Sequence, residues 1–105
     1  MKKIIIINGP NLNLLGSREQ QIYGDKSLDE IEKISKQKSK SLNIDCFFCQ
    51  SNDEGEIINH IHSVESSYEG LIINPAAFTH TSVAILDALR SINKPKIEIH
   101  LSNIY

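Results

Sequence analysis

Two residues near the end of the chain, Glu98 and His100, have the types and spacing needed for proton transfer. They are two positions apart in residues 96–101 (KIEIHL), which are predicted to form a strand, so both side chains should face the same side. A carboxylate beside an imidazole fixes the ring tautomer and raises its proton affinity, which suits a general acid. The alternative is a buried ion pair with a structural role, which fits the middle of a strand better than its end.

A second candidate for proton transfer is Tyr23, five residues after Arg18. Both lie in residues 16–26, which have no helical or strand period and are bracketed by Gly16 and Gly24, the composition of a lid. A phenol with the ordinary pKa of about 10 is a poor base, and lowering that pKa to about 7 requires roughly 4 kcal/mol of phenolate stabilisation. A desolvated guanidinium is the natural source, although an isolated loop tyrosine is more often a packing residue.

A third group of polar residues follows the apolar run at Gly70–Asn74. The run breaks at Pro75, and a small polar turn containing His80 leads into an apolar helical pattern. This pattern is typical of a buried parallel strand whose carboxyl end meets a helix, the end at which ligands bind in open α/β sheets. The alternative is a polar turn whose only role is to cap the helix, and for a single strand end that interpretation would be preferred. However, residues 8–13 and His100 also lie where predicted strands end.

The remaining segments predict the elements that position these residues. Strands are predicted at residues 3–7, 44–50, 70–74 and 96–101. Capping signals and helical periodicity predict helices that begin at Ser27, at residues 52–54 and near His80, and the last two of these should end at Ser66 and Ile92. The order βαβαβαβ predicts one α/β domain over residues 1–105. Its doubly wound parallel sheet should have the flavodoxin-like order 2-1-3-4. Strands 1, 3 and 4 are then neighbours, and their polar ends should meet at one crevice.

Composition argues against several classes of partner. The net charge is −2, and the basic cluster at residues 33–40 is interrupted by serine and glutamine at helical spacing. We therefore expect a solvated helix face there and neither a nucleic-acid nor a membrane partner. No apolar run reaches the length of a membrane span or a signal-peptide core, so a cytoplasmic location is expected.

Phosphate-loop and metal-binding motifs are also absent from the sequence. No glycine motif for phosphate is present. Cys46 and Cys49 form a C-x-x-C, but on a strand they face opposite sides, so we expect buried thiols without a disulfide or a shared metal. The histidines lack the spacing or the carboxylate shell of a metal site, and no metal is expected.

Three stretches resemble the signature sequences of type II 3-dehydroquinate dehydratase, the type II dehydroquinase of the shikimate pathway. They are INGPNLNLLGSREQQIYG (7–24), INPAAFTHTSVAILDAL (73–89) and EIHLSN (98–103), in the family's order. Their length and combination make the resemblance specific. It implies a flavodoxin-like enzyme that removes water from 3-dehydroquinate without a metal or cofactor. It also implies a homo-oligomer in which trimers assemble into a dodecamer.

The resemblance further implies a role for each matching residue. Tyr23 would be the base that takes a proton from the carbon next to the ketone, with Arg18 holding it as phenolate. An enolate would follow, stabilised by a water bound near Asn11, and His100, supported by Glu98, would protonate the departing hydroxyl. The implied substrate-binding residues are Asn74, His80, Asp87, Leu101 and Ser102.

Asp87 lies seven residues after His80, so we expect the two on one face of the same helix. The resemblance implies that Asp87 acts across a trimer contact, and that the backbone of Leu101 and Ser102 holds the substrate carboxylate.

Two features depart from the family's pattern. Ala76 stands where the family usually has glycine. The chain also ends at Tyr105, before the substrate-contacting arginine, the fifth strand and the last helix that the family has. We therefore expect an unpaired apolar edge on the fourth strand. An inactive remnant or an interaction module of the same fold is the competing interpretation.

Overall fold

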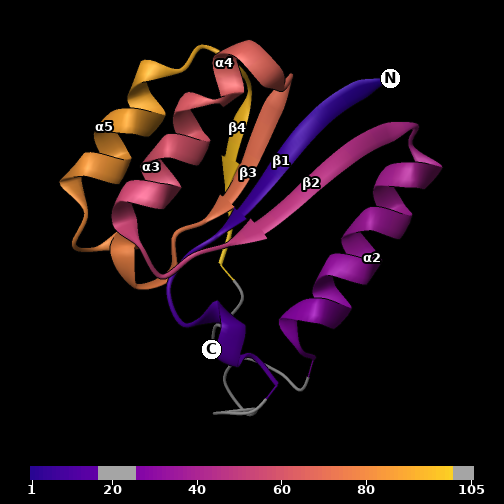
Figure 1. The fold of residues 1–105 in the computed structure, drawn as a ribbon, viewed down its shortest axis with the longest axis horizontal. Helices are drawn as coiled ribbons and strands as arrows, with labels where there is room; N and C mark the ends of the chain where they lie inside the picture. Colours follow the sequence, from indigo (N-terminus) through magenta and orange to yellow (C-terminus); the bar gives the residue numbers. More distant parts are fainter. Residues whose placement is uncertain (17–25, 101–105) are drawn as a thin grey trace.

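The computed structural model describes residues 1–16 and 26–100, which form one parallel sheet flanked by helices (Figure 1). Its strands are β1 (Lys2–Asn8), β2 (Ile44–Gln50), β3 (Gly70–Asn74) and β4 (Lys96–Glu98). Its helices are α2 (Leu28–Ser41), α3 (Glu54–His62), α4 (Val64–Ser67) and α5 (Val83–Ser91), with 3-10 turns η1 (Leu12–Leu14) and η2 (Ala76–Thr79). The strand order β2-β1-β3-β4 confirms the predicted flavodoxin-like topology.

All four strands run in the same direction, so their carboxyl ends meet at one edge of the sheet (Figure 1). At that edge Asn8 lies opposite both Gln50 and Asn74, and Ile73 lies opposite Glu98. We call the segments that follow the strands here, residues 8–13, 50–53, 74–80 and 98–100, the strand-end edge.

The main core lies between one face of the sheet and helices α3, α4 and α5, which gather on one side of the strands in Figure 1. Strands β1 and β3 supply isoleucine and leucine side chains that pack against apolar residues of the three helices. The cluster comprises Ile5, Ile7, Ile57, Ile61, Val64, Leu71, Ile73, Ile85, Ala88, Leu89 and Ile92. Burying one such isoleucine contributes about 1.5–3 kcal/mol, so this layer dominates the apolar stabilisation of the sheet.

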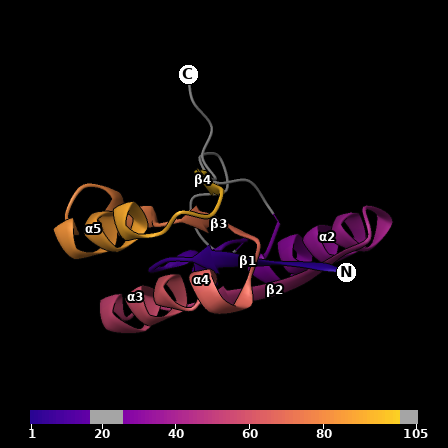
Figure 2. The same ribbon diagram turned by 90° about the horizontal axis from the view of Figure 1, so that it is seen from above.

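The opposite face of the sheet is covered less completely, because its helix, α2, packs mainly against β2 (Figure 2). The register places Ile6, Ile72 and Ile97 on this face, and they pass from buried through half-buried to 58% exposed. Apolar surface therefore increases toward β4. None of the helices in the described part of the chain is long and apolar enough to cross a membrane.

The predicted start of α2 is confirmed in atomic detail. The Ser27 side chain accepts a hydrogen bond from the Glu30 N–H, and the Glu30 carboxylate accepts one from the Ser27 N–H, both at 3.2 Å. This reciprocal pair satisfies two backbone donors that the first turn of a helix leaves free.

The second helix was predicted as one segment ending at Ser66, and that prediction is wrong. The segment breaks at Ser63 into α3 and α4. The Ser63 hydroxyl donates to the His60 carbonyl at 2.6 Å, and the Ser63 N–H donates to the carbonyls of Asn59 and His60. These bonds tighten and close the last turn of α3, so the chain restarts as a separate short helix.

The helix expected from near His80 instead begins at Val83. The Ser82 side chain accepts a hydrogen bond from the Ile85 N–H at 3.0 Å, which makes Ser82 the N-cap. His80 therefore lies before α5, and the inference that His80 and Asp87 share a helix face is wrong. The fourth strand is also shorter than predicted, although the Ile99 N–H still donates to the Ile73 carbonyl at 2.8 Å.

One turn of the strand-end edge holds an unfavourable backbone conformation. Three non-glycine residues of the described ranges have positive φ, namely Asn11 (67°), Asn43 (58°) and Ala76 (52°). Asparagine tolerates this region because its side chain bonds locally, whereas alanine does so at a cost of about 1–2 kcal/mol. The Ala76 N–H donates to the Asn74 Oδ1 at 3.1 Å, which helps to hold the turn.

Ala76→Gly should therefore raise the free energy of unfolding by about 0.5–1 kcal/mol. The gain is smaller than the strain it relieves, because glycine also gives the unfolded chain more freedom. Urea denaturation followed by circular dichroism measures the change. Ala77→Gly, in the same turn but without a positive φ, should lower stability. If the Ala76→Gly variant were no more stable than the parent, the claim that the positive φ of Ala76 costs stability would be wrong.

Candidate active site

Glu98 and His100 lie together at the end of β4. The Glu98 Oε2 and His100 Nε2 atoms are 3.1 Å apart, which confirms that the two side chains share a side. Their side chains are 49% and 44% exposed, so the alternative of a buried ion pair is wrong. Exposed pairs contribute only about 0–1 kcal/mol to stability. The contact instead suits Glu98 for orienting the imidazole ring of His100. Because Nε2 faces the Glu98 carboxylate, Nδ1 is the nitrogen that can deliver a proton to a substrate.

The loops after β1 and β3 are joined by a short backbone contact. The Gly9 N–H donates to the Asn74 carbonyl at 2.8 Å. A Cβ atom added at Gly9 would lie 2.5 Å from the Pro75 carbonyl oxygen, so any other residue there would force the loops apart. Asn74 is 2% exposed, and its side-chain oxygen is fixed by the Ala76 N–H. The predicted convergence of these two strand ends is therefore present.

The remaining predicted residues within the described ranges lie on the surface. Asn11, immediately before η1, and His80, immediately after η2, are exposed on loops of the strand-end edge. Asp87 is exposed on α5. Four predicted site residues lie outside the described residues: Arg18, Tyr23, Leu101 and Ser102.

The loop after β2 also belongs to this edge, and the sequence analysis missed it. The Asn52 Oδ1 accepts hydrogen bonds from the Asn11 N–H at 3.0 Å and from the Gln50 Nε2 at 3.1 Å. Gln50 and Asn13 also line a hollow of about 300 Å³ between β2 and α2. The available signal was the polar run Gln50-Ser51-Asn52 directly after a strand that neighbours β1.

A second interaction missed from sequence links the start of α3 to the turn that carries His80. The Ser82 hydroxyl donates to the Glu54 Oε2 at 2.5 Å, and the same Ser82 oxygen caps α5. Bonds to a carboxylate are stronger than bonds between neutral groups. Glu54 thus fixes the point at which the turn after β3 enters α5.

The C-x-x-C cysteines are on opposite faces of β2, as predicted. They lie opposite Ile4 and Ile7 of β1, three positions apart, and side chains alternate between the two faces along a strand. Both are free thiols, but they are half-buried rather than buried. Burial raises the pKa of the Cys49 thiol to about 11, with a smaller contribution from Glu56, and burial also raises the pKa of the Cys46 thiol. Cys49 is therefore protonated at neutral pH and a poor nucleophile. Within residues 1–16 and 26–100, no three His, Cys, Asp or Glu side chains cluster as a metal site would require.

Comparison with known proteins assigns the family. The model of the family described as Dehydroquinase class II matches residues 2–105. The chain belongs to the class II dehydroquinase family. The 3-dehydroquinate dehydratase of Caldicellulosiruptor saccharolyticus is 53% identical over 106 residues, which cover all of this chain and 73% of that protein.

Solved structures agree with this assignment. The type II dehydroquinase from Butyrivibrio crossotus DSM 2876 matches with a TM-score of 0.94 and 46% identity, over 98% of this chain and 72% of that one. The type II dehydroquinase from Propionibacterium acnes matches with a TM-score of 0.93 and 38% identity, over 99% of this chain and 72% of that one. Both share the fold described above, so the chain has the parallel sheet of its family.

The strand-end edge contains part of each of the three signature stretches. Residues 7–13 end β1 and enter η1, residues 73–80 end β3 and form η2, and residues 98–100 end β4. Segments that are far apart in sequence therefore meet because the strands are parallel and adjacent. We take this edge as the candidate active site.

Proposed function

We propose that this chain catalyses the dehydration of 3-dehydroquinate to 3-dehydroshikimate, a step of the shikimate pathway to aromatic amino acids. The observation that carries the proposal is the half-exposed Glu98–His100 pair at the strand-end edge, in a chain that matches class II dehydroquinases over residues 2–105. Relatives that match the whole chain are named as 3-dehydroquinate dehydratases. An inactive interaction module of the same fold is therefore not favoured.

The first step is removal of a proton from the carbon next to the ketone. Tyr23, as phenolate, takes this proton, and Arg18 stabilises the phenolate by its positive charge. The electron pair of the broken C–H bond moves into the carbonyl to give an enolate. A water held near Asn11 stabilises the enolate oxygen, in the way that fixed hydrogen-bond donors stabilise developing negative charge. The assignment of this step rests on the resemblance of residues 7–24 to the family.

The second step is loss of the hydroxyl. The enolate re-forms the carbonyl, the new carbon–carbon double bond forms, and the C–O bond breaks as His100 donates a proton to the departing oxygen. The product is therefore an enone and one water. Glu98 orients the imidazole, because its carboxylate oxygen lies 3.1 Å from Nε2. The resemblance to the family implies that the elimination is anti.

Substrate orientation is assigned to residues of the same edge. The Asn74 Oδ1 is already bonded to the Ala76 N–H, so its Nδ2 is the group that donates to a substrate hydroxyl. His80, which lies in the turn after β3, binds a second hydroxyl of the substrate. The backbone of Leu101 and Ser102 holds the carboxylate. No step in this scheme requires a metal or an organic cofactor.

Two variants separate the two steps in one experiment. In deuterated buffer, Tyr23→Phe should lose both deuterium incorporation at the α-carbon and dehydration, because no base forms the enolate. His100→Ala should keep deuterium incorporation but lose at least about a hundredfold in dehydration, as expected for removal of a general acid. Mass spectrometry of the recovered substrate and enone absorbance measure the two quantities.

Exposed His62 on α3 supplies the matched control, and His62→Ala should behave like the parent. Undiminished deuterium incorporation in the Tyr23→Phe variant would remove Tyr23 from its role as base. Dehydration near the parent rate in the His100→Ala variant would remove His100 from its role as acid. A parent protein that forms no enone from 3-dehydroquinate would refute the proposed function.

We also propose that the chain associates with further copies of itself, as trimers within a dodecamer. Support comes from exposed apolar side chains on two elements: Val83 (79%) and Leu86 (46%) on α5, beside Asp87, and Ile97 (58%) on β4. Such surfaces are typical of contacts between proteins. Asp87 would then reach the site of a neighbouring subunit.

Sedimentation velocity should therefore detect species larger than one chain, and Leu86→Glu should shift them toward the monomer because it puts a charge on the contact surface. Ser66→Glu, at an exposed position on α4, is the control and should leave the distribution unchanged. A parent chain that sediments as a monomer at tens of micromolar would contradict the association.

A further inference from the structure

The loop that carries Asn11 is held by a side chain from another strand end. The Asn11 N–H donates to the Asn52 Oδ1 at 3.0 Å, across 41 positions of sequence. Asn11 itself has φ of 67°, and its own side chain makes no capping bond to η1. The Asn11 carbonyl accepts a bond within the loop, from the Leu14 N–H at 2.9 Å, whereas the Asn11 N–H is held from outside the loop.

Gln50 determines the orientation of Asn52. Its Nε2 donates to the Gly9 carbonyl at 3.2 Å and to the Asn52 Oδ1 at 3.1 Å. With two N–H groups directed at one atom, the amide oxygen of Asn52 must occupy that position, since an amide nitrogen there would face two donors. Gln50 and Asn52 together thus join the loops after β1 and β2.

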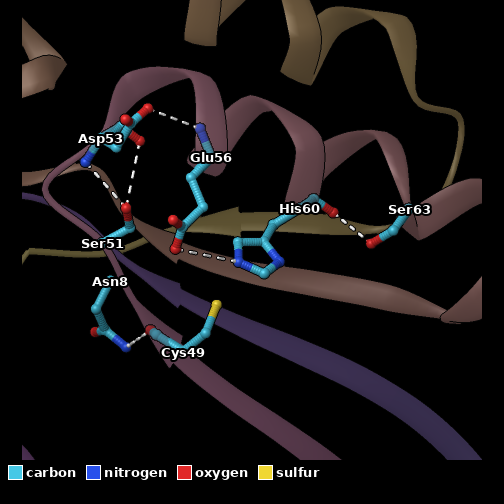
Figure 3. Close-up of polar contacts among 7 residues, drawn as sticks. All are labelled: Asn8, Cys49, Ser51, Asp53, Glu56, His60 and Ser63. Carbon is cyan, nitrogen blue, oxygen red and sulfur yellow. Dashed lines mark hydrogen bonds and ion pairs between the residues drawn. The ribbon is translucent and has the colours of Figure 1, made fainter.

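The segment that carries Asn52 is itself held by hydrogen bonds to its neighbours. The Ser51 N–H donates to the Asn8 carbonyl at 2.9 Å. The Asn8 Nδ2 donates to the Cys49 carbonyl, also at 2.9 Å (Figure 3). The Ser51 hydroxyl accepts a bond from the Asp53 N–H at 2.9 Å, and the Asp53 Oδ1 caps α3 through the Glu56 N–H at 3.0 Å (Figure 3). Asn52 therefore projects from a segment that is fixed to β1 on one side and to α3 on the other.

We infer that Asn52 is a positioning residue for Asn11, with Gln50 holding the Asn52 amide. The inference rests on the proposed function, in which Asn11 holds the water that stabilises the enolate. A fixed N–H at Asn11 restricts the direction of its side chain, and small errors in the placement of catalytic groups are costly in rate. Asn52 acts through Asn11 and has no contact with substrate in this assignment.

Asn52→Leu keeps the size of the side chain but removes the acceptor, and it should lower kcat about tenfold with KM changed less than about threefold. Asn52→Asp keeps an acceptor oxygen for both donors and should recover most of that loss. Asn11→Gly is the second background, because glycine adopts the positive φ without the side chain. There, Asn52→Leu should cost less than about twofold, since the group that it positions is gone.

Amide hydrogen exchange at Asn11, measured by NMR, tests the contact without turnover. Asn52→Leu should accelerate exchange at least about fivefold, and Asn52→Asp should not. Exposed Asn59 on α3 is the matched control, and Asn59→Leu should change neither kcat nor the amide exchange rate at Asn11. Equal losses of kcat in the parent and Asn11→Gly backgrounds, or an unchanged Asn11 exchange rate, would overturn the inference. Absence of turnover in the parent would refute the proposed function, and the exchange rate would still decide the role of Asn52.

Discussion

The hydrogen bond from the Gly9 N–H to the Asn74 carbonyl is the contact on which the candidate active site depends. It is 2.8 Å long, and it brings the two loops so close that even a methyl group at Gly9 would lie 2.5 Å from the Pro75 oxygen. The contact continues the β1–β3 register, in which Asn8 lies opposite Asn74. Because of it, the loop with Asn11 and the turn with His80 leave the sheet side by side, and β4 adds Glu98 and His100 beside them.

Stability and chemistry are separated in this molecule. The helices α3, α4 and α5 bury isoleucines and leucines on one face of the sheet, and this layer needs no polar side chain. The strand-end edge is built in the opposite way, from hydrogen bonds between side chains and backbone: the Gln50 Nε2 donates to the Gly9 carbonyl, and the Asn11 N–H donates to the Asn52 Oδ1. A rigid sheet can therefore hold polar loops in place although those loops bury little apolar surface.

The sequence was sufficient for the topology and for the contact between Glu98 and His100, because strand runs, turn residues and a period of two are local signals. It was insufficient where a boundary depends on tertiary contacts. Ser82 rather than His80 starts α5, because Ser82 bonds both to the Ile85 N–H and to Glu54 on another helix. The role of Asn52 was missed for the same reason, since its partner is 41 residues away. No local pattern distinguishes such a side chain from an ordinary loop asparagine.

The most direct test of the account is the location of the ligand. Amide shifts of the isotopically labelled protein should be recorded during titration with the equilibrium mixture of 3-dehydroquinate and its dehydrated product. We expect the largest changes among Gly9–Asn13, Asn74–His80 and Glu98–His100, because these three segments of the strand-end edge carry the described residues assigned to the substrate. Changes confined to α2 and the neighbouring face of β2, with none at those three segments, would contradict the assignment of this edge as the active site.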